Sequence, residues 1–195
     1  MSNMKSLIIR ATIERFAREG SAFSTEDVAK DVGCSHSLIF RYYKTKKGLV
    51  SACFDEICHE IRIELEKIPF PEKINSKTIQ DYMLGVWEAY FDYLRSNRPH
   101  AIVYVACVSQ GYKYPTRYDS PEAVLRRILD DHYDILMLNH PDTKIIAEYL
   151  VLAANSVAIG FSSDRGKDVD DLNNKLKHMI MKGIVSQYGD IDIEK

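Results

Sequence analysis

A chain of 195 residues with 46% hydrophobic content can form one compact domain, or a small domain fused to a larger one; no stretch approaches 18 uncharged apolar residues, so a membrane span is excluded. The net charge of −2 argues weakly against a nucleic-acid partner, but residues 1–50 contain nine Lys or Arg against five Asp or Glu, and residues 51–195 carry a net −6. A basic N-terminal part on an acidic body favours a protein that presents one end to DNA.

The N-terminal residues predict two helices with recognisable ends. Apolar side chains recur at helical spacing from about residue 4 to residue 19. Ser24 is a good N-cap for a second helix, and Asp27 stands three residues later, where it can complete a capping box. Gly33 ends that helix at a position where a left-handed backbone costs little.

A short helix rich in hydroxyl and aromatic groups follows the glycine turn. Ser35 can cap it, and we expect Ile39, Phe40 and Tyr43 to turn inward. The side chains expected to stay more exposed are those of His36, Ser37, Leu38, Arg41 and Tyr42. Two short helices around a glycine turn are the pattern of a helix-turn-helix, whose second helix can lie in the major groove of DNA.

A longer helix over residues 46–66 is predicted to follow, with Thr45 as its cap. Its first residue, Lys46, places a positive charge at the positive end of the helix dipole. That arrangement is unfavourable unless an anion lies nearby, and a DNA phosphate is such an anion.

Several motifs follow one another over about 45 residues: Phe16-Ala17-Arg18-Glu19-Gly20, Val28-Ala29, Gly33-Cys34-Ser35, Phe40-Arg41-Tyr42-Tyr43 and Thr45-Lys46-Lys47-Gly48-Leu49. In this order and spacing, residues 7–50 resemble the N-terminal domain of the TetR family of transcriptional regulators. Cys34 stands where the family usually has valine, and Phe40 replaces a frequent tyrosine, so one phosphate-directed hydroxyl is missing. Leu38 stands where a small or hydroxyl residue is common, and either contacts a thymine methyl or packs internally.

This resemblance and the helix-turn-helix pattern predict which residues contact DNA. Tyr42 and Lys46 are expected to hold phosphates, and His36 and Ser37 to face base edges. The full predicted set is Ser24, Thr25, Ser35, His36, Ser37, Tyr42, Lys44 and Lys46.

The rest of the chain also predicts helices and no sheet. Pro69 and Pro71 end the fourth helix. Apolar residues then recur at i, i+3, i+4 and i+7 over residues 78–95. The further helices are expected at 99–110, from 120 to about 138, at 142–163 and at 168–188.

The last two predicted helices carry long apolar stripes. In TetR-like regulators these helices pair with their symmetry mates as a four-helix bundle, so the resemblance implies a homodimer. Two-fold symmetry also suits two DNA-reading helices that must reach half-sites about one helical turn apart. The predicted interface residues are Ala154, Val157, Phe161, Leu176 and Ile180.

Aromatic residues are dense between positions 82 and 133. Ligand sites in helical domains are largely apolar with a few orienting hydroxyls, so a small-molecule effector site is predicted here, although such a stripe also suits an ordinary core. The favoured guest is flat or apolar and weakly charged. The predicted lining residues are Tyr82, Trp87, Tyr90, Phe91, Tyr104, Cys107 and Tyr133.

Catalytic signatures are absent from the sequence. It contains no G-x-S-x-G, HExxH, P-loop or GxGxxG motif, and its six histidines are scattered, so no catalytic residue, metal ligand or cofactor is predicted. The four cysteines form no CxxC pair, and the N-terminus lacks a signal peptide. These features favour a cytoplasmic protein with free thiols and no membrane partner.

The sequence thus predicts an all-α protein. Residues 1–48 form a three-helix helix-turn-helix domain for binding DNA, and residues 49–195 a larger helical domain for effector binding and dimerisation. The resemblance implies a homodimeric regulator, most commonly a repressor, that binds a palindromic operator in double-stranded DNA and is released by an effector. The alternative is a DNA-bound structural or partner-binding protein without a small-molecule effector.

Overall fold

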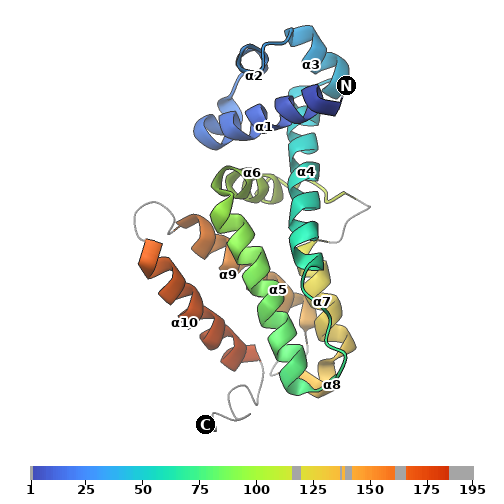
Figure 1. The fold of residues 1–195 in the computed structure, drawn as a ribbon, viewed down its shortest axis with the longest axis vertical. Coiled ribbons are helices and arrows are strands. Elements are labelled where there is room, and N and C mark those ends of the chain that lie inside the picture. Colours follow the sequence, from blue (N-terminus) through green and yellow to red (C-terminus); the bar gives the residue numbers. More distant parts are fainter. Residues whose placement is uncertain (1, 116–119, 137, 139–141, 161–165, 185–195) are drawn as a thin grey trace. The chain divides into compact units, whose positions relative to one another are not determined.

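The computed structural model describes residues 2–115, 120–136, 138, 142–160 and 166–184. Every regular element in these ranges is a helix, as the sequence predicts (Figure 1). The elements are α1 (Ser2–Glu19), η1 (Gly20–Ala22), α2 (Thr25–Asp31), α3 (His36–Tyr43), α4 (Lys46–Glu66), α5 (Ser76–Ser96), α6 (Arg98–Ser109), α7 (Pro121–Asp131), α8 (Tyr133–Leu136), α9 (Thr143–Gly160) and α10 (Gly166–Ile184). None of the described helices is long and apolar enough to cross a membrane.

Contacts between backbone positions divide the chain into two compact units. The first unit contains residues 1–60 and 97–118, and the second contains residues 61–96 and 119–195. Because α4 begins in the first unit and α6 belongs to it entirely, this division differs from the single boundary predicted after residue 48. That boundary, which separates DNA binding from effector binding, stays a prediction about function.

The first unit is built around α1, which contacts α2, η1 and α6. Its interior is apolar, and Ile8, Phe54 and Tyr104 are completely buried there. The Phe54 ring of α4 lies 5.7 Å from the Tyr104 ring of α6, between ring centres. Complete burial of a large apolar side chain contributes about 1.5–3 kcal/mol, so α6 is part of the core that supports the N-terminal helices.

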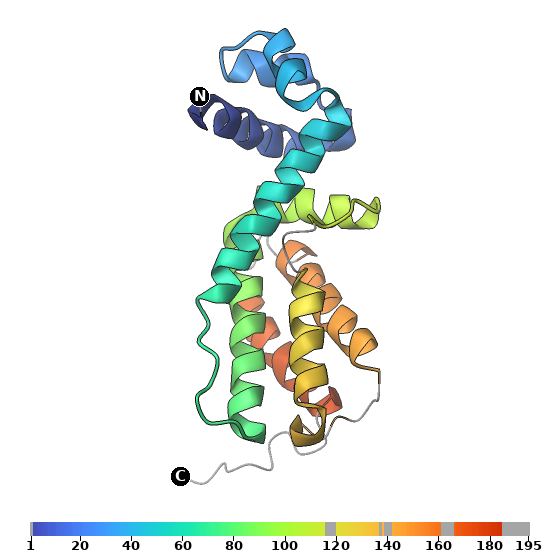
Figure 2. The same cartoon turned by 90° about the vertical axis from the view of Figure 1, so that its right-hand side faces the viewer.

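The second unit packs α9 against both α5 and α7, and α10 against α9 (Figure 2). The predicted stripe of α5 faces its core, with Ile79, Met83 and Phe91 each at most 2% exposed. Two buried hydrogen bonds tie α5 to the last two helices. The Trp87 Nε1–H donates to Asn173 Oδ1 at 3.1 Å, and the Tyr90 hydroxyl donates to Asn155 Oδ1 at 2.7 Å.

One predicted helix is interrupted. The sequence indicates a single helix from residue 120 to about 138, whereas the structure ends α7 at Asp131 and starts α8 at Tyr133. The break falls at His132, whose backbone leaves the helical region at φ −127° and ψ 20°. The His132 ring is buried, and its Nδ1 lies 3.0 Å from the Ile128 carbonyl oxygen, so a side chain satisfies part of the helix terminus.

Candidate nucleic-acid interface

The start of α2 has the predicted N-cap. The backbone N–H of Glu26 donates to Ser24 Oγ at 3.1 Å, and Ser24 has an extended backbone, as an N-cap residue should. Asp27 does not complete a capping box and instead accepts from Lys30 Nζ at 3.0 Å. The predicted box is therefore wrong, because the carboxylate finds a lysine one turn ahead on the same helix face.

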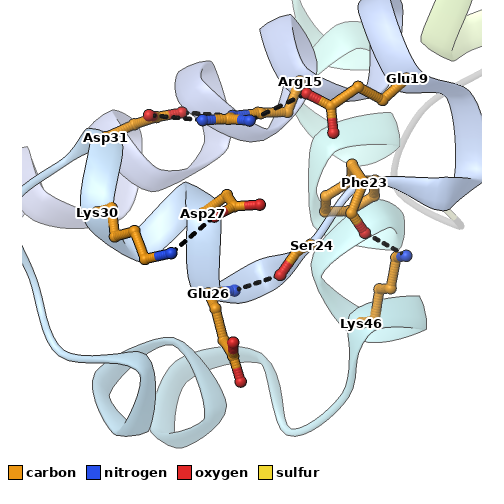
Figure 3. A network of polar contacts seen from close by, with 9 residues as sticks. All are labelled: Arg15, Glu19, Phe23, Ser24, Glu26, Asp27, Lys30, Asp31 and Lys46. Atoms are coloured by element: carbon orange, nitrogen blue, oxygen red, sulfur yellow. Dashed lines mark hydrogen bonds and ion pairs between the residues drawn. The ribbon is translucent and has the colours of Figure 1, made fainter.

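Arg15 joins α1 to the end of α2 (Figure 3). Its Nε and Nη2 donate to the two carboxylate oxygens of Asp31 at 2.6 and 2.9 Å, and its Nη1 donates to Glu19 at 3.0 Å. A guanidinium that binds a carboxylate with two parallel hydrogen bonds also fixes direction. The hydrogen bond from Arg15 holds the pKa of Asp31 below its ordinary value.

We expect Asp31→Asn to lower the thermal midpoint of unfolding slightly at pH 7 and to have a smaller effect at pH 3. The folded-state pKa of Asp31 lies below its unfolded value, so the pair stabilises at neutral pH and its contribution is lost as the pH falls below about 4. Melting curves of both proteins across this pH range measure the difference. Glu14→Gln, an exposed carboxylate on α1, is the control; a pH-independent effect of Asp31→Asn would contradict the assignment.

The turn between α2 and α3 brings predicted DNA-contacting residues together. Gly33 has φ +66°, the left-handed conformation expected from the sequence. After it, Thr25 Oγ1 at the start of α2 lies 2.9 Å from His36 Nε2 at the start of α3. The two helix N-termini are therefore linked through a pair that the sequence predicts to contact DNA.

Ser35 and Ser37 are exposed neighbours at the start of α3, with 3.0 Å between their Oγ atoms. Ser35 occupies the N-cap position, but its side chain makes no capping hydrogen bond. Ser35 is thus the N-cap residue, as predicted, but its side chain does not form the expected capping hydrogen bond. Both hydroxyls lie on the exposed surface of α3, where a helix N-terminus favours a negative partner.

The inward face of α3 is narrower than predicted. Ile39 is 2% exposed and Tyr43 is half-buried, but Phe40 is 41% exposed. The prediction for Phe40 is therefore wrong: Phe40 lies about 100° around the helix from Ile39, outside the narrow face of α3 that packs inward. Its ring meets the His36 ring edge-on at 4.7 Å between ring centres, which places Phe40 beside a residue predicted to read bases.

Positive charge surrounds the Tyr42 ring. Lys5 Nζ lies 5.2 Å from its centre and the Arg41 guanidinium carbon 5.6 Å. Burial raises the pKa of the neighbouring Tyr43 to about 12, and its hydroxyl donates to the Lys5 carbonyl at 3.3 Å. Lys5 and Arg41 were not among the predicted DNA contacts; the cationic pattern around Tyr42 becomes visible only once α1 and α3 are folded.

Lys44 and Thr45 form the turn that leads from α3 to α4. Lys44 is exposed and adopts φ +65°, unusual for a residue other than glycine. The backbone N–H of Gly48 donates to Thr45 Oγ1 at 2.9 Å, so the predicted Thr45 cap is confirmed. The turn thereby sets the direction in which α3 and the first turn of α4 present their side chains.

Lys46 is held within the protein by two carbonyl groups. Its Nζ donates to the carbonyl oxygen of Phe23 at 2.5 Å (Figure 3) and to that of Ser21 at 2.7 Å. It also lies 4.3 Å from the centre of the Phe23 ring. The ammonium group has three N–H donors. Lys46 therefore ties η1 and the residue after it to α4, a role that was not predicted from the sequence. A DNA phosphate that bound Lys46 would share the ammonium group with these two carbonyl oxygens.

The residues predicted to line an effector site fall into different units. Trp87, Tyr90 and Phe91 are buried in the second unit, where Tyr82 is half-buried and Tyr133 is 36% exposed. The remaining two, Tyr104 and Cys107, are buried in the first unit. The Tyr104 hydroxyl lies 2.5 Å from the Tyr114 hydroxyl, within a ring cluster around Phe54.

A small cavity lies in the second unit. It has a volume of about 10 Å³ and is lined by Met83, Leu84, Trp87, Leu125, Leu150, Lys177 and Met181. Of the predicted effector residues, Trp87 alone lines this cavity. Lys177, the one charged lining residue, is largely buried and forms an ion pair with Glu88.

The structure describes the side chains of only two of the residues predicted to form the dimer interface. Ala154 is fully buried within the single chain, because the face of α9 that carries it packs inward, so its side chain is not available to a partner. Leu176 is half-buried on α10. Phe161 and the side chains of Val157 and Ile180 lie outside the described residues. Exposed large apolar side chains on α9 and α10 are those of Ile145, Tyr149, Leu152 and Met179.

The four cysteines are free thiols. Cys53, Cys58 and Cys107 are buried and Cys34 is half-buried, and burial raises the pKa of the Cys34 thiol. A raised pKa lowers the fraction of reactive thiolate. Within the described ranges, no group of three or more His, Cys, Asp or Glu side chains is arranged to hold a metal ion.

Comparison with known proteins agrees with this geometry. Residues 8–53, which span α1 to the beginning of α4, match the family model described as bacterial regulatory proteins, tetR family. The whole fold is similar to a tetR-family regulatory protein from Rhodococcus RHA1, with 21% identity, a TM-score of 0.77, and coverage of 95% of this chain and 98% of that chain.

Two further structures share the fold. A TetR family transcription regulator from Marinobacter aquaeolei VT8 is 15% identical, with a TM-score of 0.74 and coverage of 94% of this chain and 96% of that chain. A structure described as the molecular basis for control of antibiotic production by bacterial hormones is 18% identical, with a TM-score of 0.68 and coverage of 95% and 99%. Residues 8–53 thus match the model of the tetR family of bacterial regulatory proteins, and the chain shares the fold of solved tetR-family regulators along nearly its whole length.

Proposed function

We propose that the protein is a ligand-responsive repressor that binds a palindromic operator as a homodimer and is released by a small-molecule effector. The observation that carries the DNA-binding part is the joined N-termini of α2 and α3. There, the contact between Thr25 and His36 and the exposed Ser35 and Ser37 gather hydroxyl and imidazole groups on one surface. Such groups bind phosphates and base edges.

The recognition surface is the predicted residue set extended by two exposed neighbours on α3. Phe40 adds an apolar side chain that suits a thymine methyl, and Arg41 adds a cation for a phosphate or a guanine. The test is selection of bound duplexes from a random-sequence DNA library by the full chain. We expect a two-fold symmetric site whose half-sites lie one helical turn, or a multiple of it, apart; recovery of unrelated sequences would reject the proposal.

We expect Lys46→Gln to weaken binding to every duplex alike and to make the slope of log affinity against log salt shallower by about 0.9, the value for one lost phosphate contact. The same change should lower thermal stability, because it removes the hydrogen bonds to Ser21 and Phe23. Titrations of the selected duplex over a salt series measure the slope. A stability loss with an unchanged salt slope would leave Lys46 with the internal role alone.

Apolar side chains that the protomer leaves exposed support the homodimer. Ile145, Tyr149 and Leu152 lie at i, i+4 and i+7 on α9 and are 55%, 55% and 63% exposed. Met179 is 68% exposed on α10, which packs against α9. Exposed apolar patches of this kind mark interaction sites, and a two-fold axis through them would cover the same residues on both copies.

The small cavity beside Trp87 is the proposed effector site. Its volume of about 10 Å³ has room for roughly one water molecule, so a ligand requires neighbouring side chains to move. Met83 and Met181 line it, and methionine is the apolar side chain that adapts most easily. One solved structure of this fold is described in terms of control by bacterial hormones, which is compatible with such a site.

We expect the fluorescence of Trp87, the single tryptophan of the chain, to change with any compound that releases the protein from its operator. Trp87→Phe should change the affinity for that compound and leave operator affinity without it nearly intact. Because the substitution leaves buried Asn173 Oδ1 without its donor, a stability loss of about 1–3 kcal/mol is also expected. Tyr82→Phe, on the same helix and outside the cavity lining, is the matched control; a releasing compound to which Trp87 is silent would place the site elsewhere.

The second candidate is a DNA-bound regulator that takes a protein partner and no small molecule. The observation in its favour is the small volume of the cavity in the second unit. On this alternative, operator binding is insensitive to every small molecule tested, and a stoichiometric protein partner covers the exposed faces of α9 and α10. Two measurements separate the candidates: whether a small molecule releases the protein from the library-selected duplex, and whether the fluorescence of Trp87 responds to that molecule.

A further inference from the structure

A second groove lies wholly within the first unit. It has a volume of about 350 Å³, within the range of about 300–1,000 Å³ typical of small-molecule sites. Its lining comes from α1, the segment around η1, the first turns of α4 and the end of α6. No residue of α2 or α3 lines it, so the groove does not include the side chains proposed to read DNA bases, but it shares Lys46, a proposed phosphate contact, with the recognition surface.

Aromatic rings form its walls and are fixed by their own contacts. Phe16 and Phe23 are 5% and 1% exposed, with 6.0 Å between ring centres. Tyr112, beyond the end of α6, meets the Phe54 ring edge-on at 6.3 Å, and its backbone N–H donates to the Cys107 carbonyl at 3.0 Å. Because these rings are already fixed by contacts within the protein, a flat ligand does not have to pay the entropy cost of ordering them when it binds.

The charged groups of the groove are all positive. Lys46 and Lys47 line it, and the remaining lining side chains are neutral, with the amide of Gln110 and the hydroxyl of Ser21 as hydrogen-bonding groups. Lys47 Nζ lies 5.8 Å from the centre of the Tyr112 ring, which attracts it through the ring face. Two cations above aromatic walls, without a lining carboxylate, are complementary to an anion that carries a flat apolar body.

We propose that this groove binds a small aromatic carboxylate, with the ring against Tyr112 and the carboxylate at Lys47. This site is distinct from the cavity beside Trp87 and does not depend on it. Lys47 is exposed, whereas two of the Lys46 donors are held by carbonyl groups, so Lys47 is the cation available to the ligand. Because its lining joins the start of α4 to the end of α6, the bound ligand stabilises the first unit.

Calorimetric titration of the full chain with 2-naphthoate tests the site, with 2-naphthamide and inorganic phosphate as comparison ligands. We expect saturable binding of one naphthoate per chain, at least roughly tenfold weaker binding of the neutral amide, and no measurable binding of phosphate, since both the charge and the ring are needed. Equal affinities for naphthoate and naphthamide would show that Lys47 does not bind the carboxylate, and would overturn the proposal. Binding of phosphate as tight as that of naphthoate would instead identify a contact for the DNA backbone.

Two variants locate the ligand. Lys47→Gln should weaken naphthoate binding roughly tenfold, and Tyr112→Leu should do so by removing the ring wall. Lys44→Gln, another exposed lysine of the first unit that does not line the groove, should leave it unchanged, as should Trp87→Phe. Naphthoate affinity that is insensitive to Lys47→Gln, or that falls with Trp87→Phe, overturns the proposal and leaves the DNA-binding proposal untouched.

Discussion

Leu152→Glu and Met179→Glu are each expected to convert the proposed homodimer into a folded monomer that no longer binds its operator at concentrations where the wild type does. Both side chains are mostly exposed in the protomer, at 63% and 68%, so the substitution costs little in the isolated chain. In a dimer the same carboxylate would be buried without a partner, at a cost of several kcal/mol. Light scattering and titration of an operator duplex measure both effects.

The matched control is Ile135→Glu, which places the same charge on an apolar side chain that is 38% exposed on α8. It should leave the dimer intact, because α8 lies outside the proposed interface. Ala154→Glu is expected to unfold the protein instead of dissociating it, since Ala154 is fully buried in the protomer. A dimer of unchanged mass for both Leu152→Glu and Met179→Glu would reject the α9–α10 interface.

Gly48→Ala is expected to lower stability by about 1–3 kcal/mol, the usual cost of an overpacked site, and to reduce operator affinity at least tenfold. A Cβ atom on Gly48 would stand 2.2 Å from the Tyr43 carbonyl oxygen, which is main chain and cannot rotate away. The turn between α3 and α4 must then shift, and with it the direction of the recognition helix. A small displacement of this kind misaligns the hydrogen bonds that read bases.

The control for this substitution is Gly183→Ala on α10, where the added Cβ meets no atom within 4 Å. It should be neutral or slightly stabilising, because alanine favours a helix more than glycine does. Denaturation curves and operator titrations of both variants measure the contrast. If Gly48→Ala kept full stability and operator affinity, the close approach to Tyr43 would not control the turn.

Local signals in the sequence were sufficient for most of the helices and for the turn between α2 and α3, but not for the break between α7 and α8. Ser24, Gly33 and Thr45 act through bonds and backbone angles within a few residues, so their roles can be read without knowing the fold. Apolar residues repeating with helical period likewise predicted α5 and its buried face. The helix-turn-helix and the family resemblance followed from these local features.

Tertiary structure decided which partner each side chain found. Asp27 turned to Lys30, and Lys46 bound the carbonyls of Ser21 and Phe23, because the nearest available group depends on how segments meet in space. The sequence predicted Phe40 to be buried, but the face of α3 that packs inward is narrow: Ile39 is 2% exposed and Phe40, about 100° further around the helix, is 41% exposed.

The sequence by itself determined an all-α chain with a basic helix-turn-helix at its N-terminus, since helical periodicity, caps and charge are properties of short segments. Only the tertiary structure decided that α6 joins the first unit, that Ala154 faces inward while Leu152 faces outward, and that Tyr104 and Trp87 lie in different units. Periodicity identifies an apolar face but not the surface that covers it. That choice depends on how distant helices pack against one another, which no local pattern of residues contains.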